Sequence, residues 1–205
     1  MKIKRILLSV LALALVAALS VGATLAFMSA EDTRVINNFS FGSISVQIAE
    51  EVPTVLPGQV EAVAAGKGVS YTKVTPGVQL TKQPAVSVKT DVEAYVFINV
   101  SGFNANLTCD GINRSWTPVA GTTDAHGNGT YYQVVEANNG MTFVDNAFES
   151  VTVSSTCTGS ETLPTVYIDV FAIQHDNIPF AEACAAAAAS FAAEAAPAPT
   201  PDPTV

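Results

Sequence analysis

The sequence predicts an all-β protein, an antiparallel β-sandwich of the jelly-roll kind that is followed by one alanine-rich helix and a proline-rich tail. Hydrophobic residues alternate with a period of two along most of the chain, which is the pattern of half-buried strands. Clusters of Gly, Pro and Asn interrupt these runs at close spacing. The strands do not alternate with amphipathic helices, so a parallel sheet is disfavoured and a sandwich is favoured.

The N-terminal residues 1–26 have the order of an export signal: basic residues, an apolar run and small residues at the exit. Cleavage between Ala26 and Phe27 would place Thr24 and Ala26 at the two positions where signal peptidases require small side chains. A retained membrane anchor is the alternative, because the apolar run approaches the roughly 20 residues that span a bilayer. The polar and charged stretch 29–34 favours removal.

Residues 27–178 are expected to form one β-sandwich domain. The first strand holds Ile44, Val46 and Ile48, with Phe39 and Phe41 in the opposite phase before a bulge near Gly42. Residues 94–100 are apolar at nearly every position, which indicates a central strand that is covered on both faces. Further strands are expected at residues 86–88, 131–135, 151–153 and 165–173.

The C-terminal residues 179–196 change in character, because they are dominated by alanine, the strongest helix former. They predict a helix. Residues 197–205 carry a proline at every second position up to Pro203 and predict a disordered, extended tail.

Charge excludes nucleic acid as a partner. The chain has 9 basic and 18 acidic residues, and removal of the signal leaves 6 basic against 18 acidic residues, hence a net charge of −12. Affinity for nucleic acid depends on Lys and Arg that neutralise phosphates. A chain with this excess of acidic residues lacks the positive charge that such binding requires.

The chain carries no motif for a nucleophilic serine, a phosphate-binding loop or a two-histidine zinc helix, so it predicts no enzyme, no cofactor and no metal site. His126 and His175 would form a metal site only if the fold brought them together. The stretch from Asp124 resembles the start of a calcium-binding EF-hand loop, but its twelfth position is Val135 instead of glutamate. A hairpin turn is therefore the preferred interpretation.

Three cysteines remain after export. Cys109 and Cys157 lie in polar surroundings and are the candidates for a disulfide, which an exported protein can keep. They bond only if the fold brings their α-carbons within about 7 Å. Cys184 lies in the alanine-rich segment.

A family resemblance rests on the start of the chain. The segment 23–31, with its small-residue exit, is followed by Asn38, Phe39 and Gly42 and by an alternating strand that ends at Glu50 or Glu51. This order resembles the TasA/camelysin-type exported proteins. Weaker similarities continue at Thr75-Pro76-Gly77, Glu93 to Phe97, Trp116, Tyr131-Tyr132 and Ala172 to Gln174.

The resemblance implies a jelly-roll sandwich from a Gram-positive bacterium that acts as a subunit or accessory of an extracellular biofilm-matrix fibre. It implies a dedicated signal peptidase, a localisation in the matrix or at the cell surface, and contact with the membrane only before cleavage. The partner would be the protein itself, as a homopolymer, or a related matrix protein. Camelysin relatives are classed as metalloproteases, but no matching metal motif occurs here, so that activity is not carried over.

The leading hypothesis is therefore a secreted structural protein that assembles by strand exchange. The donor would be the segment from Phe27 to about Ser40, which carries Val35, Ile36 and Phe39 and is freed by signal cleavage. A leader without structure at residues 27–38 is the alternative for this segment. A carbohydrate-binding adhesin is the second functional hypothesis, with Trp116, Tyr131 and Tyr132 as stacking residues, and a camelysin-like metalloprotease is the third.

Overall fold

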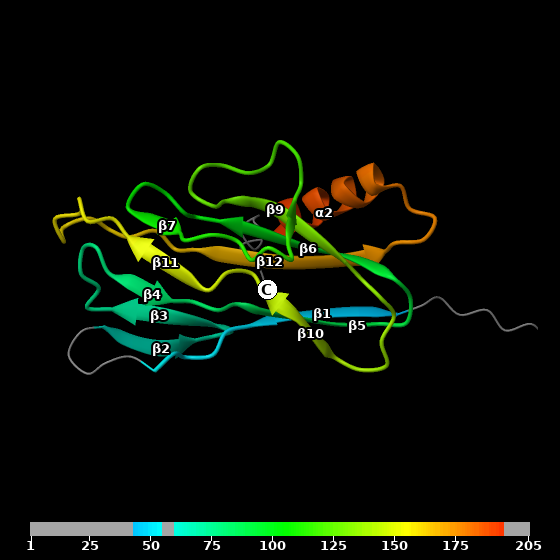
Figure 1. Ribbon diagram of the computed structural model, residues 1–205, viewed down its shortest axis with the longest axis horizontal. Coiled ribbons are helices and arrows are strands. Elements are labelled where there is room, and N and C mark those ends of the chain that lie inside the picture. The colour runs from blue at the N-terminus through cyan, green and yellow to red at the C-terminus, as the bar shows by residue number, and fades with distance from the viewer. Residues whose placement is uncertain (1–42, 55–59, 195–205) are drawn as a thin grey trace, which may run out of the picture. The chain divides into compact units, whose positions relative to one another are not determined.

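The computed structural model describes residues 43–54 and 60–194 (Figure 1). The predicted cleavage site at Ala26 and Phe27, the donor residues Val35, Ile36 and Phe39, and the proline-rich tail lie outside these residues. In the described part of the chain the strands are β1 (Ile44–Ala49), β2 (Glu61–Ala65), β3 (Gly68–Thr72), β4 (Gln79–Thr81), β5 (Ala85–Thr90), β6 (Ala94–Ser101), β7 (Leu107–Cys109), β8 (Thr117–Pro118), β9 (Gly129–Val135), β10 (Thr142–Asn146), β11 (Ser150–Val153) and β12 (Tyr167–Gln174), and the helix is α2 (Phe180–Glu194).

The strands form two facing layers, and every strand pair is antiparallel. One layer has the order β12-β6-β9-β8. The other combines β1-β5-β10 with β4-β11-β7, and the hairpin β2–β3 extends from it (Figure 1). Backbone hydrogen bonds from Lys82 to Glu149 and from Ala147 to Pro84 join the two parts of this layer. The predicted antiparallel sandwich is confirmed, while its jelly-roll connectivity stays a prediction.

Strand β6 organises both hydrophobic clusters. Its side chains Val96, Ile98 and Val100 point into the core between the layers, where they meet the apolar sides of β5, β11 and the flanking strands. On the other face, Tyr95 and Phe97 pack beneath α2. The strand therefore has little exposed surface on either side. This confirms the central strand that the continuous apolar run at residues 94–100 predicts.

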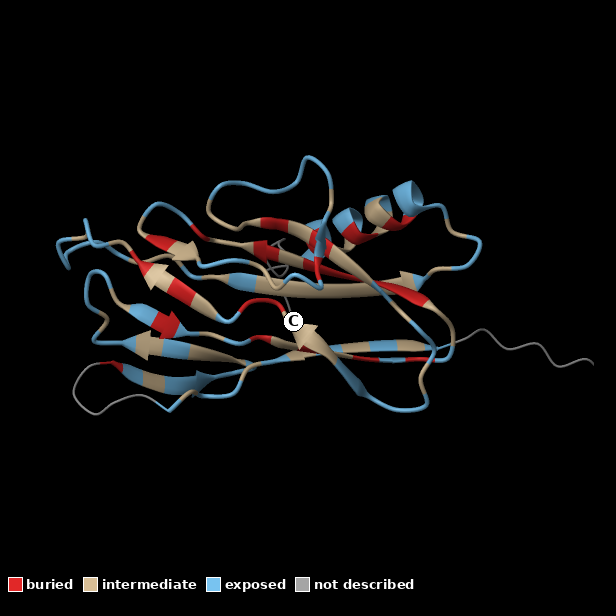
Figure 2. Ribbon diagram, in the orientation of Figure 1, coloured by how far each residue is buried: buried red, intermediate tan, exposed pale blue. Residues whose placement is uncertain are grey.

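Helix α2 covers the outer face of the β12-β6-β9-β8 sheet. Ala183, Ala187 and Phe191 are buried at a spacing of four residues, and the opposite side of the helix is exposed (Figure 2). The small alanine side chains allow the helix to approach the aromatic face of the sheet closely. The helix begins at Phe180, one residue later than predicted. At this start, the backbone amides of Glu182 and Ala183 donate hydrogen bonds to the carbonyl of Pro179.

Six of the strands in the described part of the chain, β2, β3, β4, β7, β8 and β10, are absent from the sequence prediction. Strands β2 and β3 form a hairpin, and its two-residue turn requires a positive φ, which is 63° at Gly66. The strand β2 is rich in alanine, which has a weak preference for strands, so its sequence does not indicate one. Strands β4, β7 and β8 have two or three residues each, which is too short for a period of two to be visible. In β10 the register shifts between Phe143 and Asp145, which interrupts the alternation.

Among residues 43–54 and 60–194, no helix combines the length and the hydropathy needed to cross a membrane.

Candidate functional site

A cavity of about 580 Å³ lies where the two layers meet at one side of the sandwich. Its wall combines the end of β1 at residues 48–50, the β3 side of the hairpin at residues 67–71, and residues 163–169, which lead into β12. Leu80, Leu107 and Val151 contribute its apolar floor from the core. A partly open, mainly apolar cavity with a few polar groups is the usual form of a binding site.

Two edge strands border this cavity. In the described part of the chain, β1 ends the order of its sheet and β12 ends the order of the opposite sheet. The two strands pack against each other (Figure 1). The outer backbone groups of an edge strand have no partner in their own sheet, so they can pair with another extended segment.

The polar centre of the cavity is an ion pair between Glu50 and Lys82. The Nζ atom of Lys82 lies 2.6 Å from Oε2 of Glu50, and the two side chains are only 11% and 3% exposed, respectively. The second carboxylate oxygen of Glu50, Oε1, is buried and has no hydrogen-bond partner among the described residues. A buried acceptor without a donor costs about 1–3 kcal/mol. This oxygen therefore marks a position where an incoming hydrogen-bond donor would be stabilised.

Tyr71 lies beside this pair. Burial, and to a smaller extent the Glu50 carboxylate, raise the pKa of its phenol above the usual value. The phenol thus stays protonated and donates its hydrogen bond to the carbonyl of Thr81. The three polar side chains come from the end of β1, from β3 and from the connection after β4. Their arrangement suits recognition of a polar backbone or side chain next to apolar surface.

The two histidines do not form a shared site. His126 lies in the connection between β8 and β9, where its carbonyl accepts a hydrogen bond from the amide of Cys109. His175 follows β12, and its amide donates to the carbonyl of Glu93 at the start of β6. A metal site that uses both histidines is therefore not formed.

The loop that begins at Asp124 is a turn. One carboxylate oxygen of Asp124 accepts hydrogen bonds from the amides of His126 and Asn128, at 2.8 and 3.0 Å, and the other accepts from the Asn128 side chain at 2.7 Å. These bonds, that of the Asn128 side chain above all, hold the pKa of Asp124 below its usual value. Its oxygens thus serve the turn itself, as the preference for a turn over a calcium loop predicts.

The candidate disulfide is not formed, which corrects the expectation for Cys109 and Cys157. Both cysteines are free and half-buried, as is Cys184. Cys109 is the last residue of β7 and lies against Gly127. The sulfur of Cys157 contacts the carbonyl of Asn106, which precedes β7. The two thiols thus lie at opposite ends of one strand.

Of the three aromatic residues considered for sugar stacking, two are buried and the third packs against the helix. Trp116 is 3% exposed, and its indole donates to the carbonyl of Asn146 at 3.0 Å. Tyr131 is buried in the core and donates to the carbonyl of Gly127. The ring of Tyr132 packs 4.5 Å from that of Phe180 at the start of α2. These contacts leave Trp116 and Tyr131 without a face for a sugar ring.

Comparison with protein-family models, with curated proteins and with solved structures found no match. The similarity to TasA/camelysin-type proteins therefore stays a prediction that rests on the motifs of the chain itself.

Proposed function

We propose that this protein is an exported structural subunit, or accessory, of an extracellular biofilm-matrix fibre, and that copies join by strand exchange. The acceptor is the cavity between β1 and β12, and the donor is the segment from Phe27 to about Ser40 of another copy. The observation that carries the proposal is Oε1 of Glu50, which has no hydrogen-bond partner among the described residues and lies in an apolar cavity between strands that end their sheets in this part of the chain.

The acceptor offers what an added strand requires. The outer edges of β1 and β12 present backbone groups for pairing. The apolar wall offers sites for alternate side chains of the added strand. A backbone N–H of the donor would satisfy the buried oxygen of Glu50, which an apolar ligand would leave without a partner.

The donor segment fits this acceptor in length and composition. Its 14 residues reach about 46 Å when extended, whereas the eight residues of β12 span about 27 Å. In an extended donor, Val35 and Phe39 would point to one face of the added strand and Ile36 to the other. Each side chain would contribute about 1.5–3 kcal/mol where it becomes fully buried. The remaining length allows the segment to connect two copies.

A second copy suits the acceptor better than the chain's own N-terminus does. The donor segment leads into the start of β1 at Ile44, whereas the cavity lies at the other end of β1, about 20 Å away. The segment would have to reverse its direction to fill the cavity of its own chain. Transfer between copies is a head-to-tail contact, which does not close on itself and yields filaments. Signal cleavage, which frees the donor, would start assembly.

Deletion of residues 27–38 is expected to abolish fibre formation and to leave a folded monomer, because the acceptor then has no donor. Electron microscopy of the protein starting at Phe27, beside the deletion variant, measures this, with circular dichroism and size-exclusion chromatography as folding controls. A length-matched variant with Ser at Val35, Ile36 and Phe39 separates the apolar donor side chains from chain length. It should also fail to extend fibres. Fibres of normal number and length from the deletion variant would refute strand donation.

A further inference from the structure

Three side chains that sequence analysis did not connect meet where the β6–β12 ladder ends. The Nδ1 atom of His175 lies 3.0 Å from Oε2 of Glu93 and 3.5 Å from Oδ1 of Asp176. All three ligand atoms lie within 4.8 Å of one another. Glu93 directly precedes β6, and the other two residues directly follow β12.

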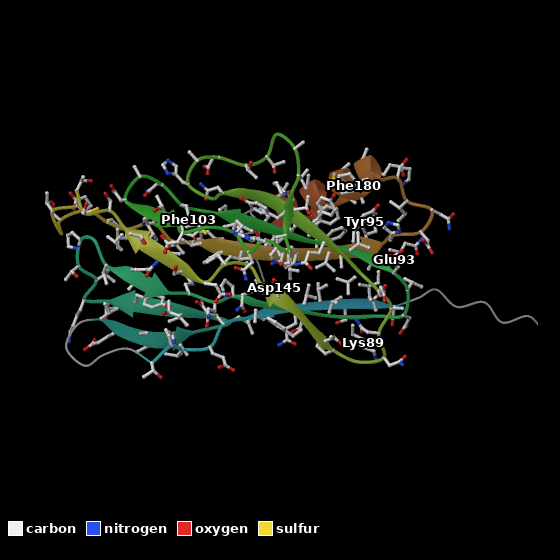
Figure 3. The ribbon with its side chains drawn as sticks, viewed as in Figure 1. Lys89, Glu93, Tyr95, Phe103, Asp145 and Phe180 are labelled. Atoms are coloured by element: carbon white, nitrogen blue, oxygen red, sulfur yellow. The ribbon has the colours of Figure 1, made fainter. Side chains whose placement is uncertain are left out.

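The backbone and neighbouring rings hold this group in place. The amide of His175 donates to the carbonyl of Glu93 at 2.8 Å, which continues the register of the two strands. The imidazole lies 4.6 Å from the ring of Tyr95, measured between centroids. The side chain of Gln174 donates to the carbonyl of Asp176. The ring of Tyr95 lies 5.5 Å from that of Phe180, where α2 begins, measured between centroids (Figure 3).

We propose that Glu93, His175 and Asp176 form a binding site for a divalent transition-metal ion of the zinc type. In a tetrahedral zinc site with bonds of 2.0–2.1 Å, neighbouring ligand atoms are about 3.3 Å apart. The two distances from Nδ1 of His175 bracket this value. One imidazole nitrogen and two carboxylate oxygens are a ligand set that zinc and its neighbours accept.

A salt bridge between His175 and the two carboxylates explains their arrangement less well than a bound metal ion does. Nδ1 of His175 carries one proton at most, and that proton can form one good hydrogen bond, yet the nitrogen faces two carboxylates. A cation bound to Nδ1 attracts both carboxylates at once. The repulsion between Glu93 and Asp176 is then relieved as well.

The bound ion would have a structural effect. It would join the start of β6 to the turn between β12 and α2, where Asn177 has a positive φ of 62°. Three protein ligands leave the fourth zinc position for water or for a group from another molecule. The site does not involve the cavity at Glu50, so this inference is independent of the proposed function.

Titration of the metal-free mature protein with Zn²⁺ by calorimetry, and with Co²⁺ by visible absorption, tests the site. We expect one ion per chain, and at least tenfold weaker binding in His175→Ala, because loss of a supporting outer-shell partner alone costs about 10- to 100-fold. The matched control His126→Ala removes the other histidine and should bind like the unaltered protein. Asp176→Asn, at an exposed position, tests a ligand without risk to the fold and should also weaken binding.

Two results would overturn the site. Equal binding by His175→Ala and the unaltered protein would place the ion elsewhere. No binding of Zn²⁺ by the unaltered protein up to about 1 mM of the ion would leave the group as an ion pair only.

Discussion

Replacement of Lys82 by alanine is expected to lower the free energy of unfolding by about 3 kcal/mol. The change removes the partner of Glu50 and leaves a carboxylate that is only 3% exposed without a countercharge. The expected loss is at the lower end for buried ion pairs because the cavity beside Glu50 is partly open to water. Chemical denaturation followed by circular dichroism measures it.

Two further variants give this prediction its controls. Lys89→Ala removes a lysine from exposed surface and should change stability by less than about 0.5 kcal/mol. The double replacement Glu50→Leu with Lys82→Met should return to within about 1 kcal/mol of the original protein, because well-packed apolar residues substitute for buried ion pairs. Equal stabilities for Lys82→Ala and Lys89→Ala would mean that the pair is not buried as described.

Replacement of Phe97 by alanine is expected to destabilise the protein by about 3–5 kcal/mol. Phe97 is fully buried, and its ring lies 6.0–6.5 Å from those of Tyr132, Phe171 and Phe180. Its removal leaves a cavity between the central strand and α2, which the β6 backbone cannot fill. A loss of this size is a large part of the 5–15 kcal/mol that usually stabilises a domain.

The matched control for Phe97 is Phe143→Ala, because Phe143 is 56% exposed on β10. Its removal should cost less than about 0.5 kcal/mol. Thermal unfolding should show the same contrast, with a drop of about 10 °C for Phe97→Ala. Similar melting temperatures for both variants would contradict the packing of α2 on the sheet.

The features that the sequence predicts well are those encoded locally. The apolar run at residues 94–100 has no polar side in either phase until Asn99, so it indicates a strand buried on both faces. The alanine-rich segment predicts α2 because helix propensity is itself local. The hairpin β2–β3 is not predictable in the same way, because it depends on pairing and on one glycine turn.

The candidate sites depend on contacts between distant parts of the chain. Glu50 and Lys82 are 32 residues apart, and each looks like an ordinary surface charge in the sequence. Glu93 and His175 come together only through the register of β6 with β12. The sequence indicates that Glu93 and His175 each lie at the end of a strand, but it does not indicate that these two strands are paired. The bond considered for Cys109 and Cys157 fails for the same reason, since β7 keeps the thiols at opposite ends.

The acceptor role of the cavity is the central claim, and binding of a donor peptide tests it most directly. A labelled peptide of residues 27–40 would be titrated into protein that lacks residues 27–38, with fluorescence anisotropy as the readout. We expect saturable binding that is lost when Val35, Ile36 and Phe39 of the peptide are serine. Binding should also fall at least tenfold in Ser70→Trp, which places a bulky ring at an exposed position of the cavity wall. Equal binding of both peptides, or no effect of Ser70→Trp, would contradict the account.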